Sequence, residues 1–456
     1  MTDSVSRTMA RFSVGLAYED LPSEVIHDVK RFLYDSLACA YGALETEDVT
    51  IVHQVVTEMG GRPEATAIAF GDRLPAANAA FLNSLMVRAL DYNDIYWKQD
   101  PSHPSDLIPA ALAAGERAGT SMKEVITAIV LAYEFEMRLC EFAVPGIRER
   151  KWHHATLTQF VSPLVAGKVL GLTEDQMVNA VGISASHNFT VGAVTAGQLT
   201  MMKNTVDPMA VQAGVMAALL AQRGYTGTEP IVEGKEGLVE VLGPGWDTEK
   251  LVGGLGSSFK IRECSMKAFP TEALTHTHLS ATLKLVREND IKAEDIEEVR
   301  ITTIARACDI LFDPQKYRPE SRETADHSLP FCVARAILDR EITPASFSRE
   351  KIDDPRLKRL IHTIKGEASK DFEELFPEKQ PSRVTIRTRD GREFSVYLEY
   401  PKGDPREPMT EEDLDLKFQA LTRQVLPPER QRKIKELVYG CEDVGDVGEF
   451  MRGFAV

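Results

Sequence analysis

Charged and imidazole side chains gather at five places along the chain, and the first place carries most of them. Arg88, Asp91 and Asp94 occur within seven residues at the expected end of a helix, and His103 follows in a loop beside Pro104. Carboxylates and an imidazole that collect where a helix ends suit a site built from loops on a rigid body. The same residues could instead cap the helix and form an ordinary turn.

The next two groups offer imidazoles and an amine. His153 and His154 are adjacent, and neighbouring helix residues point about 100° apart, so the pair is a poor metal chelate. One of the two better suits hydrogen bonding or proton transfer, and a helix cap or a surface position is the alternative. Lys203 follows a stretch rich in small residues and precedes a helix, although most lysines are solvated surface charges.

The last two groups lie near a change in the character of the chain. Lys267 opens the run K-A-F-P-T-E, which ends at Glu272, and a boundary between architectures is a favoured place for a pocket. Arg322 and His327 lie in a polar run that leads into an apolar helix and could equally form its N-terminus. Together the five groups supply cations, carboxylates and imidazoles, which suits acid–base work on a polyanion.

Motifs for bound nucleotides and metals are missing from the sequence. It contains no G-x-x-x-x-G-K-[ST], and the glycines at 253–256 do not fit the dinucleotide spacing, so we interpret them as a hinge or loop. The six cysteines are scattered without a C-x-x-C pair, which argues against a structural zinc site or an iron–sulfur cluster. The sequence therefore predicts chemistry without a metal or a cofactor.

Composition narrows the class of protein further. The 456 residues carry a formal net charge of −16, which argues against binding to a nucleic-acid backbone but permits a local basic pocket. No apolar stretch is long enough to span a bilayer, and the N-terminus lacks the apolar core of a signal peptide. With few cysteines, the sequence predicts a cytoplasmic protein with reduced thiols and neither a membrane nor a nucleic-acid partner.

The elements that must position these residues change type along the chain. The first 250 residues show helical periodicity, with capping motifs at Ser121 and Thr173, and predict a helical bundle. From about residue 265 the pattern predicts a smaller α+β unit. Its expected strands are 299–303 and the two arms of an Asp-Gly hairpin, 384–388 and 394–400.

Further expected elements complete the outline. A short strand is expected at 258–263, and helices are expected at 331–339 and 356–364. After a linker at 401–408, a helix capped by Thr410 and a last helix over 429–439 are predicted.

The five groups, taken in order, resemble the MmgE/PrpD family over nearly the whole chain. The run R-A-L-D-Y-N-D at 88–94 with H-P-S-D at 103–106 is similar to the most specific signature of that family, in the form of its 2-methylcitrate dehydratase branch. The stretches around His154, Lys203 and 267–272, and R-E-T-A-D-H-S-L-P-F at 322–331, match in order and spacing. Five ordered matches are more specific than any single motif.

The resemblance implies a mainly α fold with an inserted lid. A large all-helical domain would comprise residues 1–265 and be completed by the tail 403–456, and a smaller α+β lid domain would comprise 266–402. It also implies a homodimer, a basic cleft between the domains, and no metal or cofactor. The expected activity is that of a hydro-lyase, which dehydrates 2-methylcitrate or a close tricarboxylate.

Site residues follow from the resemblance position by position. The catalytic set falls on Asp91, His103, His154, Lys203 and Lys267, with the lysines holding substrate carboxylates. Within this set we expect His103 or His154 to be the acid and Asp91 to be the base or its orienter. Residues expected to bind substrate are Arg88, Asp94, Glu272, Arg322 and His327.

Several positions depart from the family pattern and keep alternatives open. Ile95 stands where many members have Thr, Glu272 where the decarboxylase branch has His, and Phe331 where that branch has Tyr. A site that lacks a polar partner discriminates strongly between similar substrates. An epimerase or isomerase, a cis-aconitate-type decarboxylase, and a binding protein without turnover are the alternatives.

Overall fold

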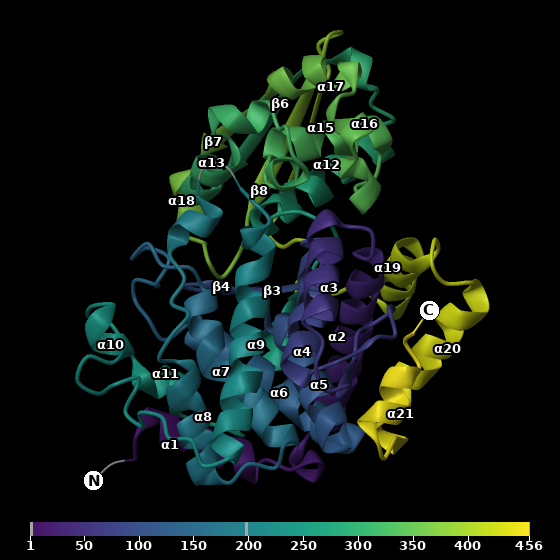
Figure 1. The fold of residues 1–456 in the computed structure, drawn as a ribbon. Helices are drawn as coiled ribbons and strands as arrows, with labels where there is room; N and C mark the ends of the chain where they lie inside the picture. Colours follow the sequence, from purple (N-terminus) through teal and green to yellow (C-terminus); the bar gives the residue numbers. More distant parts are fainter. Residues whose placement is uncertain (1–2, 197–198, 456) are drawn as a thin grey trace.

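The chain folds into two lobes of unequal size, a helical body and an α+β lobe above it in the view of Figure 1. The structure is a computed structural model that describes residues 3–196 and 199–455. The α-helices of the body up to the α+β lobe are α1 (Val5–Gly15), α2 (Ser23–Gly42), α3 (Glu47–Met59), α4 (Ala76–Arg88), α5 (Ile108–Ala118), α6 (Met122–Leu139), α7 (Ala155–Val169), α8 (Glu174–Ser184), α9 (Met202–Gln222), α10 (Leu238–Val241) and α11 (Thr248–Val252).

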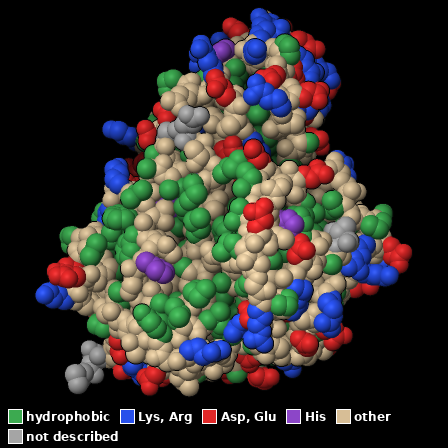
Figure 2. All heavy atoms as spheres, in the orientation of Figure 1, with side chains coloured by type: hydrophobic (Ala, Val, Ile, Leu, Met, Phe, Trp, Pro, Cys, Tyr) green, Lys and Arg blue, Asp and Glu red, His purple; other side chains and the backbone are tan. Residues whose placement is uncertain are grey.

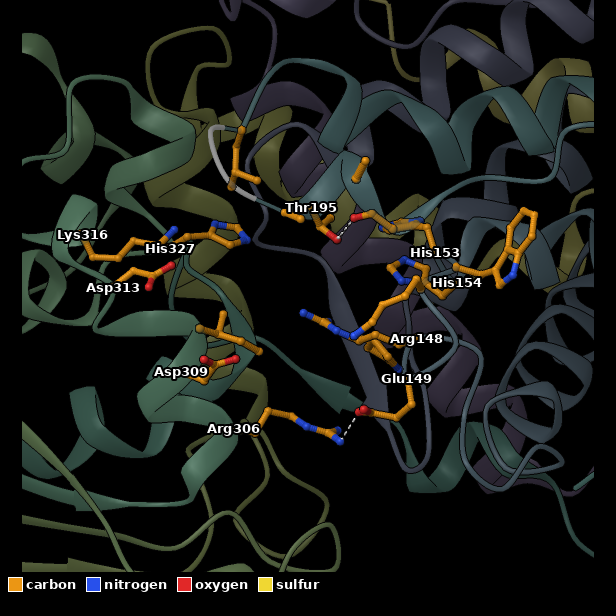
Figure 3. A pocket seen from close by; sticks show the side chains of 18 of the residues that line it. Arg148, Glu149, His153, His154, Thr195, Arg306, Asp309, Asp313, Lys316 and His327 are labelled. Atoms are coloured by element: carbon orange, nitrogen blue, oxygen red, sulfur yellow. Dashed lines mark hydrogen bonds and ion pairs between the residues drawn. The ribbon is translucent and has the colours of Figure 1, made fainter. Parts of the chain in front are cut away.

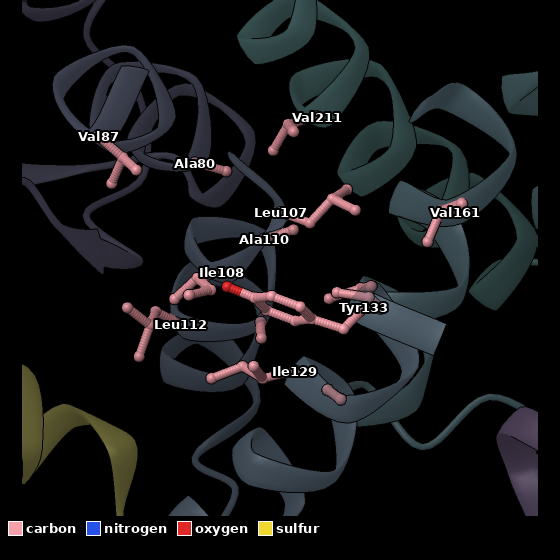
Figure 4. Packing of buried hydrophobic residues seen from close by; sticks show 14 of the residues in the cluster. Ala80, Val87, Leu107, Ile108, Ala110, Leu112, Ile129, Tyr133, Val161 and Val211 are labelled. Carbon is pink, nitrogen blue, oxygen red and sulfur yellow. The ribbon is translucent and has the colours of Figure 1, made fainter. Parts of the chain in front are cut away.

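Helix α6 forms the centre of the body because it is apolar on almost every side. Ser121 caps it by accepting a hydrogen bond from the backbone of Glu124, as the sequence predicts, and every residue from Val125 to Leu139 is buried. Figure 4 shows Ile129 and Tyr133 of this helix packed among side chains of α4, α5, α7 and α9. Thr173 likewise forms the expected capping box at the start of α8.

The C-terminal segment returns to the body and closes it. It forms α19 (Glu411–Thr422), α20 (Pro428–Tyr439) and α21 (Val447–Arg452), and α19 and α20 pack on α2 while α21 packs on α5. Thr410 caps α19 in a capping box with Asp413, which confirms that prediction. The buried Lys417 of α19 pairs with Asp35 of α2 at 2.6 Å.

The α+β lobe is built on a four-stranded sheet in the order β7-β6-β8-β9. Strand β6 runs parallel to β7 and antiparallel to β8, and the predicted Asp-Gly hairpin joins β8 to β9. Helices α12 and α15 pack together in this lobe, and α12 also packs on β8 and β9. The strands are β6 (Ile296–Thr303), β7 (Ile364–Ala368), β8 (Ser382–Thr388) and β9 (Glu393–Leu398), and the helices are α12 (His276–Glu288), α13 (Ala305–Leu311), α14 (Arg322–Ala325), α15 (Leu329–Asp339), α16 (Arg349–Ile352), α17 (Pro355–Leu360) and α18 (Lys370–Glu373).

One sequence prediction is wrong in this region. The expected strand at 258–263 is instead a 3₁₀ turn, Lys260–Glu263, because the backbone of Lys260 donates to Glu134 of α6 and leaves no sheet edge to join. The helix expected at 356–364 is present as α17 to Leu360 and continues as a 3₁₀ turn, Ile361–Thr363, before Ile364 pairs with Val299 as the first residue of β7.

Short strands join the two lobes. The chain leaves α4 and forms β3 (Asp94–Trp97), which pairs with β4 (Pro101–Ser102) and β5 (Ser265–Met266). The ring of Trp97 belongs to the hydrophobic core of the α+β lobe. A further small ladder, β1 (Ala65–Thr66) with β2 (Arg73–Leu74), lies at the edge of the body. Among the described residues, no helix combines the length and the apolar character that a membrane span requires.

Candidate active site

A cleft between the two lobes brings the five sequence groups together. Its outer part has a volume of about 660 Å³ and continues into a recess of about 60 Å³. Figure 3 shows Arg148, His153 and His154 on the side of the helical body, facing His327 and Lys316 of the α+β lobe. All five residues expected to be catalytic line the recess: Asp91, His103, His154, Lys203 and Lys267.

Asp91 lies at the centre of the recess and contacts three cations. One carboxylate oxygen, Oδ1, lies 2.6 Å from Lys267 Nζ and 2.6 Å from Arg88 Nη1, and the other, Oδ2, lies 3.0 Å from Lys203 Nζ. All four side chains are almost fully buried. One carboxylate cannot neutralise three cations, so the recess carries an excess of positive charge that suits an anionic ligand.

The end of α4 creates this cluster. The helix stops at Arg88, and Asp91 adopts a left-handed backbone conformation with φ of 49°, which aspartate tolerates better than most residues. The turn brings the Asp91 carboxylate back to Arg88 and then directs the chain into β3. Lys267 arrives from β5, the strand that pairs with β3.

The charges of the cluster fix its protonation. Burial alone would raise the pKa of Asp91, but the charges of Lys203, Lys267 and Arg88 hold it well below its usual range. Burial lowers the pKa of Lys267, against the attraction of Asp91. Asp91 is therefore a permanent anion whose lone pairs are taken up by cations, and it fits an orienting role better than that of a base.

Two helix N-termini point at the recess and add to its positive potential. His154 is the N-cap residue of α7, and Lys203 lies in the first turn of α9. Unpaired backbone N–H groups and the helix dipole favour an anion at such ends. Asp207 follows Lys203 by four residues, so both side chains project from the same face of α9.

His103 is oriented by the chain itself. Its Nδ1 lies 2.6 Å from the carbonyl oxygen of Asp94, and a carbonyl only accepts, so Nδ1 carries the proton and Nε2 holds a free lone pair. Burial and the charges of Arg88 and Lys267 hold the pKa of His103 well below its ordinary value. His103 is thus a neutral imidazole that can accept a proton.

His154 lies beside a carboxylate, whereas His103 lies beside a neutral carbonyl group. Nε2 of His154 lies 3.2 Å from Oδ2 of Asp207, and the two imidazoles of His103 and His154 lie with ring centroids 5.7 Å apart. Burial would raise the pKa of Asp207, but the neighbouring His154 brings it well below the usual value. Asp207 is therefore an anionic neighbour of the His154 imidazole.

A buried carboxylic acid, Glu136, is linked through Thr158 to the Asp207 that lies beside His154. Glu136 Oε1 accepts hydrogen bonds from Ser102 Oγ at 2.5 Å and from Thr158 Oγ1 at 2.8 Å, and Thr158 also contacts Asp207. Within the described part of the chain, Oε2 of Glu136 has no hydrogen-bond partner. Burial raises the pKa of Glu136 to about 8, so the group is neutral at pH 7.

Glu136→Gln should change how stability depends on pH. The folded pKa of about 8 exceeds the ordinary value of 4.5, so the folded protein keeps a proton that the unfolded chain releases within this window. The wild type should therefore lose stability as the pH rises from about 5 to 8, and the variant should lose less over the same range. Melting temperatures of both proteins from pH 5 to 8 check this, and parallel curves would contradict it.

The five residues expected to bind substrate divide into two sets. Arg88, Glu272 and His327 line the recess. Asp94 and Arg322 are not among the lining residues: Asp94 accepts hydrogen bonds from the backbone and hydroxyl of Ser105 behind the recess, and Arg322 donates to the carbonyl oxygen of Ala89. Both residues therefore bind segments of the chain that carry other site residues, and neither lines the recess.

Glu272 is a buried acid on the wall of the recess. One of its carboxylate oxygens accepts a hydrogen bond from the backbone of Leu274 at 2.7 Å. Burial raises the pKa of Glu272 to about 7, against the charges of Lys267 and Arg148. Phe331, where the decarboxylase branch has a hydroxyl, packs in the core of the α+β lobe against Phe347 and does not line the recess.

The sequence analysis missed two groups: Asp207, which is buried beside His154, and Arg148, which lines the cleft. From the sequence, Asp207 is an ordinary interior residue of a helix. Only its spacing of four residues from Lys203 could have indicated that it belongs to the site. Arg148 lies in a loop between α6 and α7, where nothing in the sequence distinguishes it from other surface arginines. Two sets of residues could hold a cation within the described chain, His153 with His154 and Asp207, and Asp91 with Asp326 and His327.

Two family models match successive parts of the chain, and several known proteins are similar to nearly all of it. Residues 7–250 match the family model of the MmgE/PrpD N-terminal domain, and residues 269–443 match that of the MmgE/PrpD C-terminal domain. A cis-aconitate decarboxylase of Aspergillus terreus is 25% identical, over 98% of this chain and 95% of its own length. One of Mus musculus is 26% identical over 99% and 93%, and a 2-methylcitrate dehydratase of Salmonella typhimurium is 27% identical over 85% and 84%.

Proposed function

Because the chain belongs to the MmgE/PrpD family, we propose that it is a lyase that acts on a small polycarboxylate without a metal or other cofactor. We further propose that it dehydrates 2-methylcitrate or a close tricarboxylate. The observation that carries the proposal is the cluster of Arg88, Lys203 and Lys267 around Asp91, beside a neutral His103. Such a recess binds a carboxylate and stabilises the charge that develops on it when a neighbouring proton is removed.

The base in this proposal is His103. Its Nε2 removes the proton α to the bound carboxylate, because this nitrogen holds the free lone pair and Nδ1–H is fixed by the Asp94 carbonyl. Lys203 and Lys267 stabilise the enediolate-like intermediate as point charges. Asp91 keeps both ammonium groups in place and takes no proton.

The acid in this proposal is His154, with Asp207 as its partner. Loss of hydroxide from the intermediate requires a proton on the departing oxygen, and the protonated imidazole supplies it. The electron pair of the broken C–H bond then forms the C=C bond of 2-methyl-cis-aconitate, and the hydroxyl leaves as water. His103 then releases its proton to solvent and His154 takes one up from solvent, which restores the starting state.

The proposal is tested by incubating the purified protein with 2-methylcitrate, citrate, isocitrate and cis-aconitate. Products are identified by mass, and formation of a conjugated double bond is followed by ultraviolet absorbance. Loss of water from 2-methylcitrate supports the hydro-lyase. Loss of carbon dioxide from cis-aconitate would replace it with the decarboxylase.

The decarboxylase is the second candidate because relatives with that name match almost the full chain. Glu272 argues against the decarboxylase. The sequence resemblance implies that the decarboxylase branch has a histidine at this position of the recess, where this chain has an acid.

We also propose that the protein is a homodimer that associates through α9 and α3. Met202, Met209 and Met216 recur at seven-residue spacing on α9 and are 41 to 49% exposed, and Ile51 and Val55 are exposed on α3. Figure 2 shows apolar side chains gathered on this face of the helical body. A broad exposed apolar surface of this kind is typical of a protein–protein contact.

The double variant Met209→Glu/Met216→Glu should therefore be monomeric while the wild type is a dimer, because two carboxylates would have to be desolvated in the contact. Light scattering during size-exclusion chromatography measures the mass. Leu416→Glu is the matched control, since Leu416 is equally apolar and 58% exposed but lies on α19. A dimeric double variant would place the contact elsewhere.

A further inference from the structure

One cation of the cleft has no part in the chemistry described so far. Arg148 lines both the recess and the outer cleft, and it is the arginine that reaches from the helical body toward the α+β lobe in Figure 3. Its guanidinium forms no hydrogen bond or ion pair with any residue in 3–196 or 199–455 and lies 5.6 Å from the ring centroid of Trp97. Arg306, another arginine of the cleft, is already paired with Glu149 at 2.5 Å.

The backbone of Arg148 is held firmly by a buried carboxylate. Asp100 is fully buried and accepts hydrogen bonds from the backbone N–H groups of Ile147 at 2.8 Å and Arg148 at 2.9 Å. A side chain at Gly146 would lie only 2.7 Å from the same carboxylate, so this glycine permits the close approach. The backbone of the loop is therefore preorganised, and the Arg148 side chain extends from a fixed Cα position.

The dimensions of the cleft require a second contact for a large anion. The recess of about 60 Å³ is much smaller than the outer cleft of about 660 Å³, so most of the space for a large anion lies in the outer cleft. The rest of a tricarboxylate must extend into the outer cleft and pass Arg148, which borders both spaces. A partly buried guanidinium without a partner gains most from a carboxylate, to which it can donate two hydrogen bonds.

We propose that Arg148 binds a second carboxylate of the substrate, one that takes no part in proton removal. Arg148 would then select polycarboxylates over monocarboxylates. The inference rests on the proposed function for the class of substrate, but it does not depend on which reaction follows.

The test uses tricarballylate, a tricarboxylate without a hydroxyl group that cannot be dehydrated. Its dissociation constant is measured by calorimetry with the wild type, Arg148→Gln, Arg148→Lys and Lys250→Gln. Lys250 is the matched control because it is an exposed cation on α11 that lines neither the recess nor the outer cleft, and its removal changes the net charge equally. Melting temperatures without ligand show whether each variant is folded.

Arg148→Gln should weaken tricarballylate binding about tenfold to a hundredfold, because a charged hydrogen-bond pair is lost. Arg148→Lys should recover part of the affinity, since it keeps the charge but not the paired geometry. With the reactive substrate, KM should rise more than kcat falls. Equal affinities in Arg148→Gln and Lys250→Gln would overturn the inference.

The outcome separates this inference from the proposed function. If the wild type binds tricarballylate through Arg148 but dehydrates nothing, the carboxylate contact stands and the reaction assignment falls. If the wild type does not bind tricarballylate at all, both fall. Should Arg148→Gln fail to fold, Arg148→Lys provides the comparison, and wild-type affinity and wild-type kinetics in that variant would contradict paired binding at this position.

Discussion

Lys267→Met should reduce turnover by about a hundredfold to a thousandfold, which is the effect of removing one group that stabilises developing negative charge. Lys267 Nζ is 2.6 Å from Asp91 Oδ1 and also donates to the carbonyl oxygens of Asp91 and Thr271, so a shorter apolar side chain leaves all three without this donor. Steady-state kinetics with the best substrate of the panel measures the loss.

The same substitution should lower the melting temperature by several degrees and leave the protein folded. Removing one partner from a buried ion pair is destabilising, but Arg88 and Lys203 still neutralise Asp91. Lys30→Met is the matched control, because Lys30 is also a buried lysine in an ion pair, with Glu442, far from the cleft. That variant should lose stability and keep its turnover number. Wild-type turnover in Lys267→Met would refute the assignment of the recess.

His103→Gln should lower turnover by about a hundredfold to ten-thousandfold, the range expected when a general base is removed. The glutamine side chain can still donate to the Asp94 carbonyl, so the loss reports the missing base and not a collapsed loop. His278→Gln is the control for losing a buried imidazole. Both nitrogens of His278 are bonded to hydroxyl groups inside the α+β lobe, so that variant should lose stability and keep its turnover.

The wild type should also keep its activity at mildly acidic pH. Because burial and the charges of Arg88 and Lys267 hold the pKa of His103 well below its ordinary value, the imidazole stays neutral as the pH falls through 6.5. We expect kcat/KM of the wild type not to decline as the pH falls from 8 to about 6, and to decline only at lower pH. A decline centred near pH 6.5 would indicate an unperturbed histidine as the essential base.

Local signals in the sequence predicted most elements correctly, and their physical origin explains why. An Asp-Gly pair between β-rich runs specifies the hairpin of β8 and β9, and Thr410 specifies the start of α19, because both effects act within a few residues. The expected strand at 258–263 failed because a distant carboxylate, Glu134, binds the backbone of Lys260. Contacts over more than a hundred residues are invisible to local patterns.

The same limit applies to the site. Composition and spacing indicated acids, bases and cations, but only the resemblance to a family grouped Asp91 with Lys267, which lie 176 residues apart in the chain. Arg148 escaped both approaches. Its proposed role rests on a guanidinium at the junction of two cavities that pairs with no residue in 3–196 or 199–455, and neither its burial nor this lack of a partner can be predicted from the sequence.

The most direct test of the account is nuclear magnetic resonance of the wild-type protein with 2-methylcitrate in deuterated water. The methyl group of the substrate is coupled to the α-proton, so removal of that proton followed by loss of water converts its doublet into the singlet of 2-methyl-cis-aconitate. The account predicts this product, without added metal. Exchange of the α-proton without loss of water would assign an epimerase instead. If neither 2-methylcitrate nor any other tricarboxylate of the panel exchanges a proton or loses water, the central claim is wrong.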